Sequence, residues 1–188
     1  MSRADMQLLG RDLTTQAAAL AAGELSSVEL VGQVLAAIDA SQPAVNSYIA
    51  VDADAALAAA SASDQRRARG QAGALEGLPV AVKDNIDVAG VRTTAGMGTR
   101  RDAPPASADS PSVAALRGAG AILVGKLNMH EAAMGADNDN PFYGACHNPH
   151  RPGYTPGGSS GGSGAAVAAG LCAAALGTDT MGSVRIPA

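Results

Sequence analysis

Aromatic residues are scarce in this 188-residue sequence: they make up 2% of the chain, with three tyrosines, one phenylalanine and no tryptophan. A core must therefore be packed from Ala, Val, Leu, Ile and Met. Small side chains let backbones approach closely, but each one buries little apolar area. We therefore expect an extensive, finely fitted core without large rings as anchors.

Positive charge is also low, because 13 Lys and Arg face 17 Asp and Glu, giving a net charge of −4. This balance argues against binding to nucleic acid through phosphate neutralisation. The uncharged run over residues 154–178 is interrupted by Pro156 and by many Gly and Ser residues. Such a run does not resemble a membrane span. We expect neither a nucleic acid nor a membrane as a direct partner.

Cysteine is nearly absent. Cys146 and Cys172 lack metal-ligand spacing and are too few for a disulfide framework. The first ten residues contain no apolar core of the kind found in secretory signals. Both observations predict a protein of the reducing cytoplasm, without a secretory signal.

The order of the predicted elements indicates an α/β fold. Apolar residues at helical spacing and capping residues predict helices over 14–22, 28–38, 52–69 and 110–117, with Pro43 ending the second. Short apolar runs at 78–82 and 121–124 predict buried strands. Residues 137–158 read as a long loop, and residues 165–169 as a further helix. Helix, strand and polar loop in succession are typical of a sheet covered by helices.

The Gly/Ser-rich segment 157–163 can be interpreted in several ways. A phosphate-binding loop is one, but the Lys-Ser/Thr ending of a P-loop is missing. A nucleophile elbow is another, because residues 157–161 and 158–162 both read G-x-S-x-G, although no histidine follows residue 150. A flexible loop is the third. This segment alone does not decide among them.

Two further segments help to choose among these interpretations of segment 157–163. Residues 77–85 contain a strand that ends in Lys83-Asp84-Asn85, and residues 177–188 contain Met181-Gly182-Ser183-Val184-Arg185. With segment 157–163 between them, the sequence resembles the amidase signature family over nearly its whole length. The resemblance implies a mixed β-sheet core covered by helices on both faces. Because family members are longer, we expect the truncated, N-terminal portion of a single amidase domain, with a helical region over 1–70 and an incomplete catalytic α/β core over 71–188.

The resemblance implies a catalytic triad of Lys83, Ser159 and Ser183. Ser183 would be the nucleophile, and Ser159 would follow a cis peptide bond from Gly158. A serine hydroxyl needs a base, and a lysine serves as one only when neutral, which burial favours. Lys83 ends an apolar strand and meets that condition. Ser159 would relay the proton from Ser183 to Lys83, giving an acyl-enzyme that water hydrolyses.

The same resemblance implies an oxyanion hole made by the backbone N–H groups of Thr180, Met181, Gly182 and Ser183. Most members carry glycine where this chain has Met181. Two interpretations stay open: methionine strains the turn if this position needs a positive φ, or it lines and tightens the acyl pocket.

Other polar residues are candidates for supporting roles. We expect Asp179 and Arg185 to form an ion pair that holds the turn at Ser183, although both could be ordinary surface charges. Ser160, Ser163 and Thr178 could add hydrogen bonds, and Asp84 and Asn85 could brace the Lys83 loop. The group Lys126, Asn128, His130 and Glu131 lacks the spacing of a metal site. No metal and no cofactor are expected.

The predicted reaction is hydrolysis of a small-molecule carboxylic amide to a carboxylate and an amine or ammonia. One alternative is the glutamine-hydrolysing A-type subunit of a tRNA-dependent amidotransferase. Another is an inactive truncated fragment of an amidase. A homodimer stays open.

Overall fold

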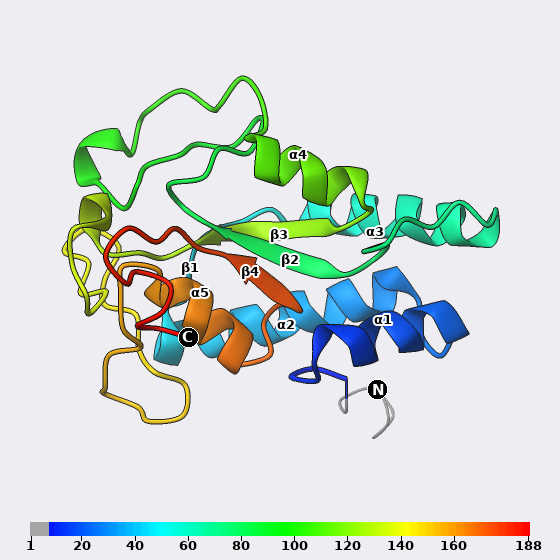
Figure 1. Cartoon of the computed structure of the whole chain (residues 1–188), viewed down its shortest axis with the longest axis horizontal. Helices are drawn as coiled ribbons and strands as arrows, with labels where there is room; N and C mark the ends of the chain where they lie inside the picture. The colour runs from blue at the N-terminus through cyan, green and yellow to red at the C-terminus, as the bar shows by residue number, and fades with distance from the viewer. Residues whose placement is uncertain (1–7) are drawn as a thin grey trace.

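A computed structural model describes residues 8–188 of the chain (Figure 1). The N-terminal residues on which the expected lack of a secretory signal rests lie mostly outside this range. Four strands form one sheet in the order β1–β3–β2–β4. Strand β2 is parallel to both β3 and β4, whereas β1 is antiparallel to β3. The strands are β1 (Tyr48–Val51), β2 (Pro79–Lys83), β3 (Ile122–Leu127) and β4 (Ala174–Leu176).

Helices cover both faces of this mixed sheet, as expected (Figure 1). Side chains of α2, α3 and α5 pack with Ala81 and Ile122 on one face. On the other face, Val113 of α4 packs with Val82 and Val88. The helices are α1 (Leu13–Ala22), α2 (Ser27–Val45), α3 (Ala53–Ala68), α4 (Pro111–Gly118) and α5 (Gly161–Ala168), with short 3-10 turns at Gly98–Arg100 and Glu131–Ala133. No helix within residues 8–188 is long and apolar enough to cross a membrane.

Two details of the region 1–70 differ from the sequence prediction. Pro43 does not end the second helix, because α2 continues to Val45 and stops at Asn46, whose φ is 51°. Pro43 lacks the N–H that would bond to the carbonyl four residues before it, so the last turn of α2 has one bond fewer but is not ended there. The sequence does not predict strand β1, which has four residues, the last two of them exposed. Such a short edge strand leaves almost no periodic pattern.

Glycines let α5 begin at Gly161, four residues before the predicted start. A Cβ atom on Gly162 would lie 2.3 Å from the carbonyl oxygen of Asn128, and one on Gly161 would lie 2.6 Å from the Cβ of Asn138. The first turn of α5 therefore sits directly against the segment that follows β3. This contact fixes Ser159 and Ser160, which immediately precede the helix.

A β-bulge decides which faces the two lysines occupy. The pairing of β2 with β3 shifts register between Val80 and Ala81, so that Val124 is the extra residue. Beyond the bulge, Lys126 lies beside Val82, whose side chain packs on the α4 face. Lys83 alternates with Val82 and shares the opposite face with Ala81.

Candidate active site

Lys83 lies at the C-terminal end of β2 and has no exposed surface. Its Nζ is 2.7 Å from the Oγ of Ser159 and 2.8 Å from the Oγ of Ser160. It also lies 2.9 Å from the Oγ1 of Thr178. The end of one strand, the segment before α5 and the segment after β4 thus converge on one amine.

The surroundings of Lys83 disfavour its charged form. Among the described residues, its hydrogen-bond partners are three hydroxyls and the Thr178 carbonyl, without a carboxylate. Burial lowers the pKa of Lys83 to about 8, and the charge of Asp179 acts in the opposite direction. A neutral amine has two N–H donors and one lone pair, so it can donate to two of the hydroxyls and accept from the third.

Ser159 follows a cis peptide bond from Gly158, as the resemblance implied. Ser159 and Ser160 are both fully buried. The carbonyl of Ser159 accepts a hydrogen bond from the N–H of His130 at 3.1 Å. The hydroxyl of Ser160 in turn donates to the Thr178 carbonyl at 3.2 Å.

Ser183 lies in a turn next to this cluster. The N–H of Ser160 donates to the carbonyl of Ser183 at 3.0 Å, which ties the two segments together. Within residues 8–188, the Ser183 hydroxyl has no hydrogen-bond partner. Ser183 is half-buried, and its backbone carbonyl makes the contact with this cluster.

Asp179 organises the Ser183 turn. Its carboxylate forms a bidentate ion pair with Arg185, with N–O distances of 2.8 and 3.1 Å. It also accepts hydrogen bonds from the N–H groups of Gly182 and Val184, at 2.8 and 2.9 Å. The Arg185 guanidinium and these N–H groups hold the pKa of Asp179 well below its usual range. The expected pairing of Asp179 with Arg185 is therefore present, and the carboxylate also binds the backbone of the turn.

The four backbone N–H groups that we expect in the oxyanion hole differ in whether they already have an acceptor. The N–H of Gly182 is already bound to Asp179, so it does not fit that role. Within the described chain, the N–H groups of Thr180, Met181 and Ser183 have no acceptor. Gly182 has a φ of 115°, which favours glycine, whereas Met181 is not among the residues with positive φ. Methionine therefore does not strain the turn, and its side chain is 90% exposed.

Asp84 and Asn85 do brace the Lys83 loop, but in different ways. The side-chain amide of Asn85 donates to the Oγ1 of Thr178 at 2.9 Å. Asp84 is buried and pairs with Lys126 at 3.1 Å. The sequence motifs do not predict this role of Lys126, although a lone charge within a buried apolar strand is a usable sign of an internal ion pair.

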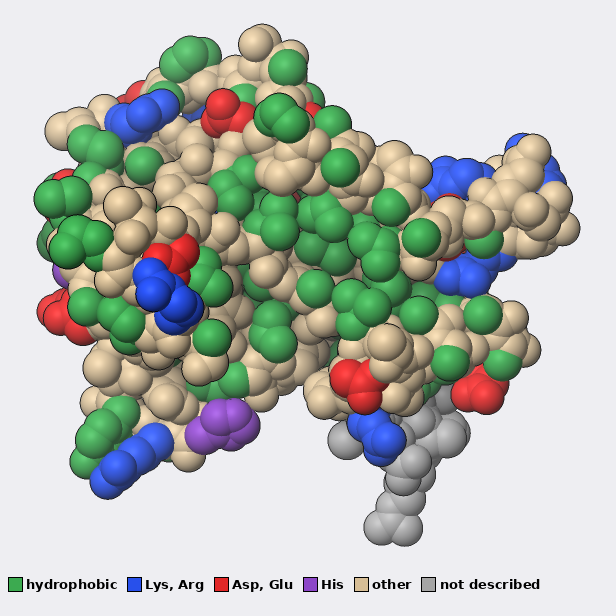
Figure 2. Space-filling view, viewed as in Figure 1, with side chains coloured by type: hydrophobic (Ala, Val, Ile, Leu, Met, Phe, Trp, Pro, Cys, Tyr) green, Lys and Arg blue, Asp and Glu red, His purple; other side chains and the backbone are tan. Residues whose placement is uncertain are grey.

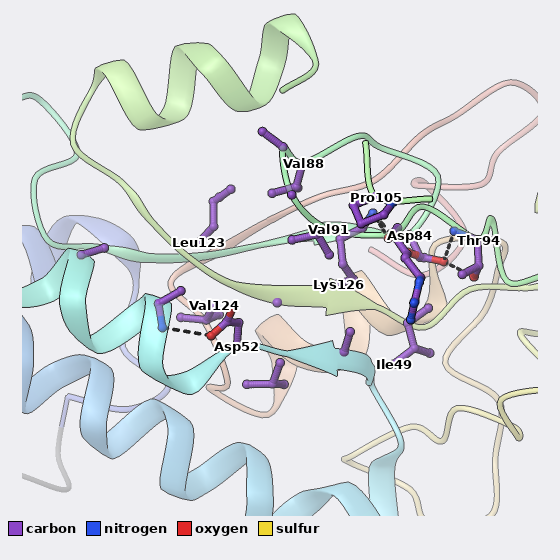
Figure 3. Close-up of a pocket in the computed structure, with 18 of the residues that line it drawn as sticks. Ile49, Asp52, Asp84, Val88, Val91, Thr94, Pro105, Leu123, Val124 and Lys126 are labelled. Atoms are coloured by element: carbon purple, nitrogen blue, oxygen red, sulfur yellow. Dashed lines mark hydrogen bonds and ion pairs between the residues drawn. The ribbon is translucent and has the colours of Figure 1, made fainter. Parts of the chain in front are cut away.

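A cavity of about 570 Å³ lies beside this ion pair, between β1, β3 and the loop after β2 (Figure 3). Asp84 and Lys126 line it, but Lys83, Ser159 and Ser183 do not.

His130 pairs with Asp137 at 2.9 Å. Across residues 8–188, no group of three His, Cys, Asp or Glu residues could hold a metal ion.

The Amidase family model matches residues 29–188, and the chain therefore belongs to the amidase signature family. It is 52% identical over 178 residues to the A-type subunit of the glutamyl-tRNA(Gln) amidotransferase of Chromohalobacter salexigens. That match covers 95% of this chain and 36% of the relative.

Solved structures agree with this assignment. The native peptide amidase from Stenotrophomonas maltophilia superposes with a TM-score of 0.86 at 36% identity, over 94% of this chain and 37% of that one. A chain of a vestigial protein complex, described as revealing the origins of an s-triazine catabolic enzyme, superposes with a TM-score of 0.92 at 44% identity. That match covers 94% of this chain and 39% of the solved chain. This chain therefore spans well under half the length of the relatives that it matches.

Proposed function

We propose that this chain carries the catalytic serine-lysine centre of an amidase, which hydrolyses a small-molecule carboxylic amide to a carboxylate and an amine or ammonia. The observation that carries the proposal is the Lys83 site. A fully buried lysine with a lowered pKa, bound by the hydroxyl of Ser159 and without a carboxylate partner in the described part of the chain, is suited to act as a base.

In the proposed reaction, Ser183 attacks the amide carbonyl carbon. Its proton passes to the Oγ of Ser159, while the proton of Ser159 passes to the Nζ of neutral Lys83. The protonated Lys83 then returns a proton through Ser159 to the leaving nitrogen, and the C–N bond breaks. Water attacks the resulting ester with the same base, and this step releases the carboxylate and regenerates Ser183.

The negative oxygen of each tetrahedral intermediate needs hydrogen-bond donors. We assign this role to the N–H groups of Thr180, Met181 and Ser183, which have no acceptor among the described residues. Each donor of this kind is typically worth about 3 kcal/mol in the transition state. Asp179 and Arg185 would hold the turn that aims these groups.

A second candidate function is that of the glutamine-hydrolysing component of a tRNA-dependent amidotransferase. The 52% identity to the A-type subunit of a glutamyl-tRNA(Gln) amidotransferase favours it. The chemistry at Ser183 would be the same, but the substrate would be glutamine and a partner protein would receive the ammonia. Glutaminase activity without turnover of other amides would support this candidate.

The test is an assay on a panel of amides, including glutamine, with trapping of the acyl-enzyme by hydroxylamine. The chain is assayed alone and coexpressed with the part of the Chromohalobacter relative that lies beyond the match. Ser183→Ala should reduce turnover at least about a thousandfold, whereas Ser107→Ala, an exposed serine, should leave it unchanged. Equal rates in the two variants would refute the proposal. Turnover only on coexpression would identify the chain as an inactive fragment that needs the rest of an amidase.

We also propose a cytoplasmic location, which is supported by two cysteines that are free and buried. A homodimer is the proposed oligomer, formed through the open edge of the sheet at β4.

A further inference from the structure

The chain contains only two lysines, and both are buried at the same end of the sheet. Lys83 has no exposed surface and Lys126 has 2%. In the parallel pairing of β2 with β3, Lys126 lies opposite Val82, the residue before Lys83. The two ammonium groups therefore leave neighbouring strands on opposite faces of the sheet.

Their surroundings differ in one respect. The Nζ of Lys126 lies 3.1 Å from the Oδ1 of Asp84 and 3.0 Å from the Oγ1 of Thr93, with the carbonyl of Arg92 at 3.3 Å. Lys83 instead meets three hydroxyls and a carbonyl. One buried lysine thus has a carboxylate partner, and the other has none among the described residues.

The carboxylate in question belongs to Asp84, the residue directly after Lys83. Its Oδ2 accepts the N–H of Thr94 at 3.0 Å and also the Thr94 hydroxyl, as Figure 3 shows. Its Oδ1 faces Lys126. The backbone holds the same position, because the N–H of Asp84 donates to the carbonyl of Leu127 at 3.2 Å. Both oxygens of the acid nearest to Lys83 in sequence are therefore bound on the other side of the sheet.

We propose that Lys126 is a positioning residue, which holds the Asp84 carboxylate on the face opposite Lys83 and so leaves Lys83 buried without a counter-ion. This inference deepens the proposed function, on which its catalytic meaning rests. A lysine that is buried beside a carboxylate keeps its proton, whereas one that is buried among hydroxyls releases it more easily. The Asp84–Lys126 pair adds no net charge to the interior, so it braces the loop without raising the proton affinity of Lys83.

The other charged groups near Lys83 are few. Asp179, on the segment after β4, faces it and is itself paired with Arg185. His130, after β3, is paired with Asp137. Helix α5, which packs against the same face, contains no charged residue. A change in proton affinity after substitution at Lys126 or Asp84 can therefore be assigned to that pair.

Because the chain has only two lysines, the titration of Lys83 can be measured directly. In a chain labelled with ¹³C at lysine Cε, NMR shows two side-chain signals, and in Lys126→Met the remaining one is Lys83. We expect the titration midpoint of Lys83 to rise by about one pH unit in Lys126→Met, because the negative charge of Asp84 is then no longer neutralised by Lys126. Asp84→Asn should shift the midpoint in the opposite direction. The double variant Asp84→Asn/Lys126→Met, which removes both charges, should titrate like the wild type.

The matched control is Arg117→Met, which breaks the ion pair of Arg117 with Asp109 on the surface. It should leave Lys83 unchanged. Should Lys126→Met fail to fold, Asp84→Asn and the double variant still decide the question. An unchanged Lys83 midpoint in folded Asp84→Asn, or a double variant that shifts as far as Lys126→Met, overturns the proposal.

This measurement does not need turnover, so it can be separated from the test of the proposed function. If Lys83 responds as expected but Ser183→Ala leaves amide hydrolysis intact, the positioning role stands and the assigned catalysis fails. If Ser183→Ala abolishes hydrolysis and Lys83 does not respond to Asp84 or Lys126, the catalysis stands and the positioning role fails.

Discussion

At the scale of single residues, Lys83 shows a conflict between folding and chemistry. An ammonium group that has no exposed surface and, within residues 8–188, no bound carboxylate is costly to bury, and this cost is what lowers its pKa to about 8. In the unfolded chain, a lysine titrates near its ordinary value of about 10.4. The folded state therefore loses its proton earlier than the unfolded state as the pH rises.

This difference predicts how stability depends on pH. Between about pH 8 and the ordinary lysine pKa, the unfolded chain binds more protons at Lys83 than the folded chain does, so unfolding becomes less favourable as the pH rises. The free energy of unfolding of the wild type should therefore increase relative to that of Lys83→Met across this window. Urea denaturation of both proteins at several pH values measures the difference, in which the contributions of other titrating groups cancel.

Arg117→Met is the control for this experiment, because an arginine keeps its proton throughout the window. Its difference from the wild type should stay flat with pH. A flat difference for Lys83→Met as well would mean that Lys83 has an ordinary pKa in the folded chain.

At the scale of elements, the glycines of α5 lower its helix propensity but allow close contact with neighbouring backbone. Glycine in a helix costs about 0.5–1 kcal/mol relative to alanine. In Gly162, the missing side chain lets the helix approach the carbonyl oxygens of Asn128 and Ser47, where a Cβ would lie at 2.3 and 2.7 Å. These atoms belong to backbone and cannot move aside easily.

Gly162→Ala should therefore destabilise the chain by at least about 2 kcal/mol, despite the better helix propensity of alanine. Gly32 provides a matched control inside α2, since a Cβ there meets nothing within 4 Å. Gly32→Ala should stabilise by about 0.5–1 kcal/mol. Urea denaturation measures both, and a Gly162→Ala protein as stable as Gly32→Ala would refute the close-packing explanation.

The elements also show what could be read from the sequence. Helices α3 and α4 were predictable because Asp52 and Ser110 cap them and apolar spacing follows. The candidate site residues Lys83, Ser159 and Ser183 were predicted from the resemblance to the amidase signature family, whose three motifs occur in the same order in this sequence. The pairing of Lys126 with Asp84 could not be predicted, because the bulge at Val124 reverses the face on which Lys126 lies. Periodicity alone would have placed it beside Lys83.

At the scale of the whole molecule, one edge of the sheet is uncovered. Within residues 8–188, β4 pairs only with β2, and its three residues are partly exposed. Beside it lies an apolar groove of about 310 Å³ lined by α5 and the C-terminal segment. Two apolar residues that line this groove are exposed: Val167 is 45% exposed and Val184 is 36% exposed. In Figure 2, hydrophobic side chains gather across the middle of this face, where β4 and β2 lie in Figure 1.

An open strand edge with an apolar groove beside it is a template for association. The relatives are far longer than this chain, which spans 36% of the Chromohalobacter protein, and in the absence of further polypeptide a second copy is the available partner. We predict that the 188-residue chain self-associates through β4 and the groove, so that its weight-average mass in light scattering rises with concentration.

Val167→Lys should weaken this association, because dimerisation would bury the new charge beside apolar groups. Met134 is 84% exposed but does not line the groove, so Met134→Lys should leave association unchanged. Equal effects of the two lysines would indicate a general gain in solubility rather than an interface at β4.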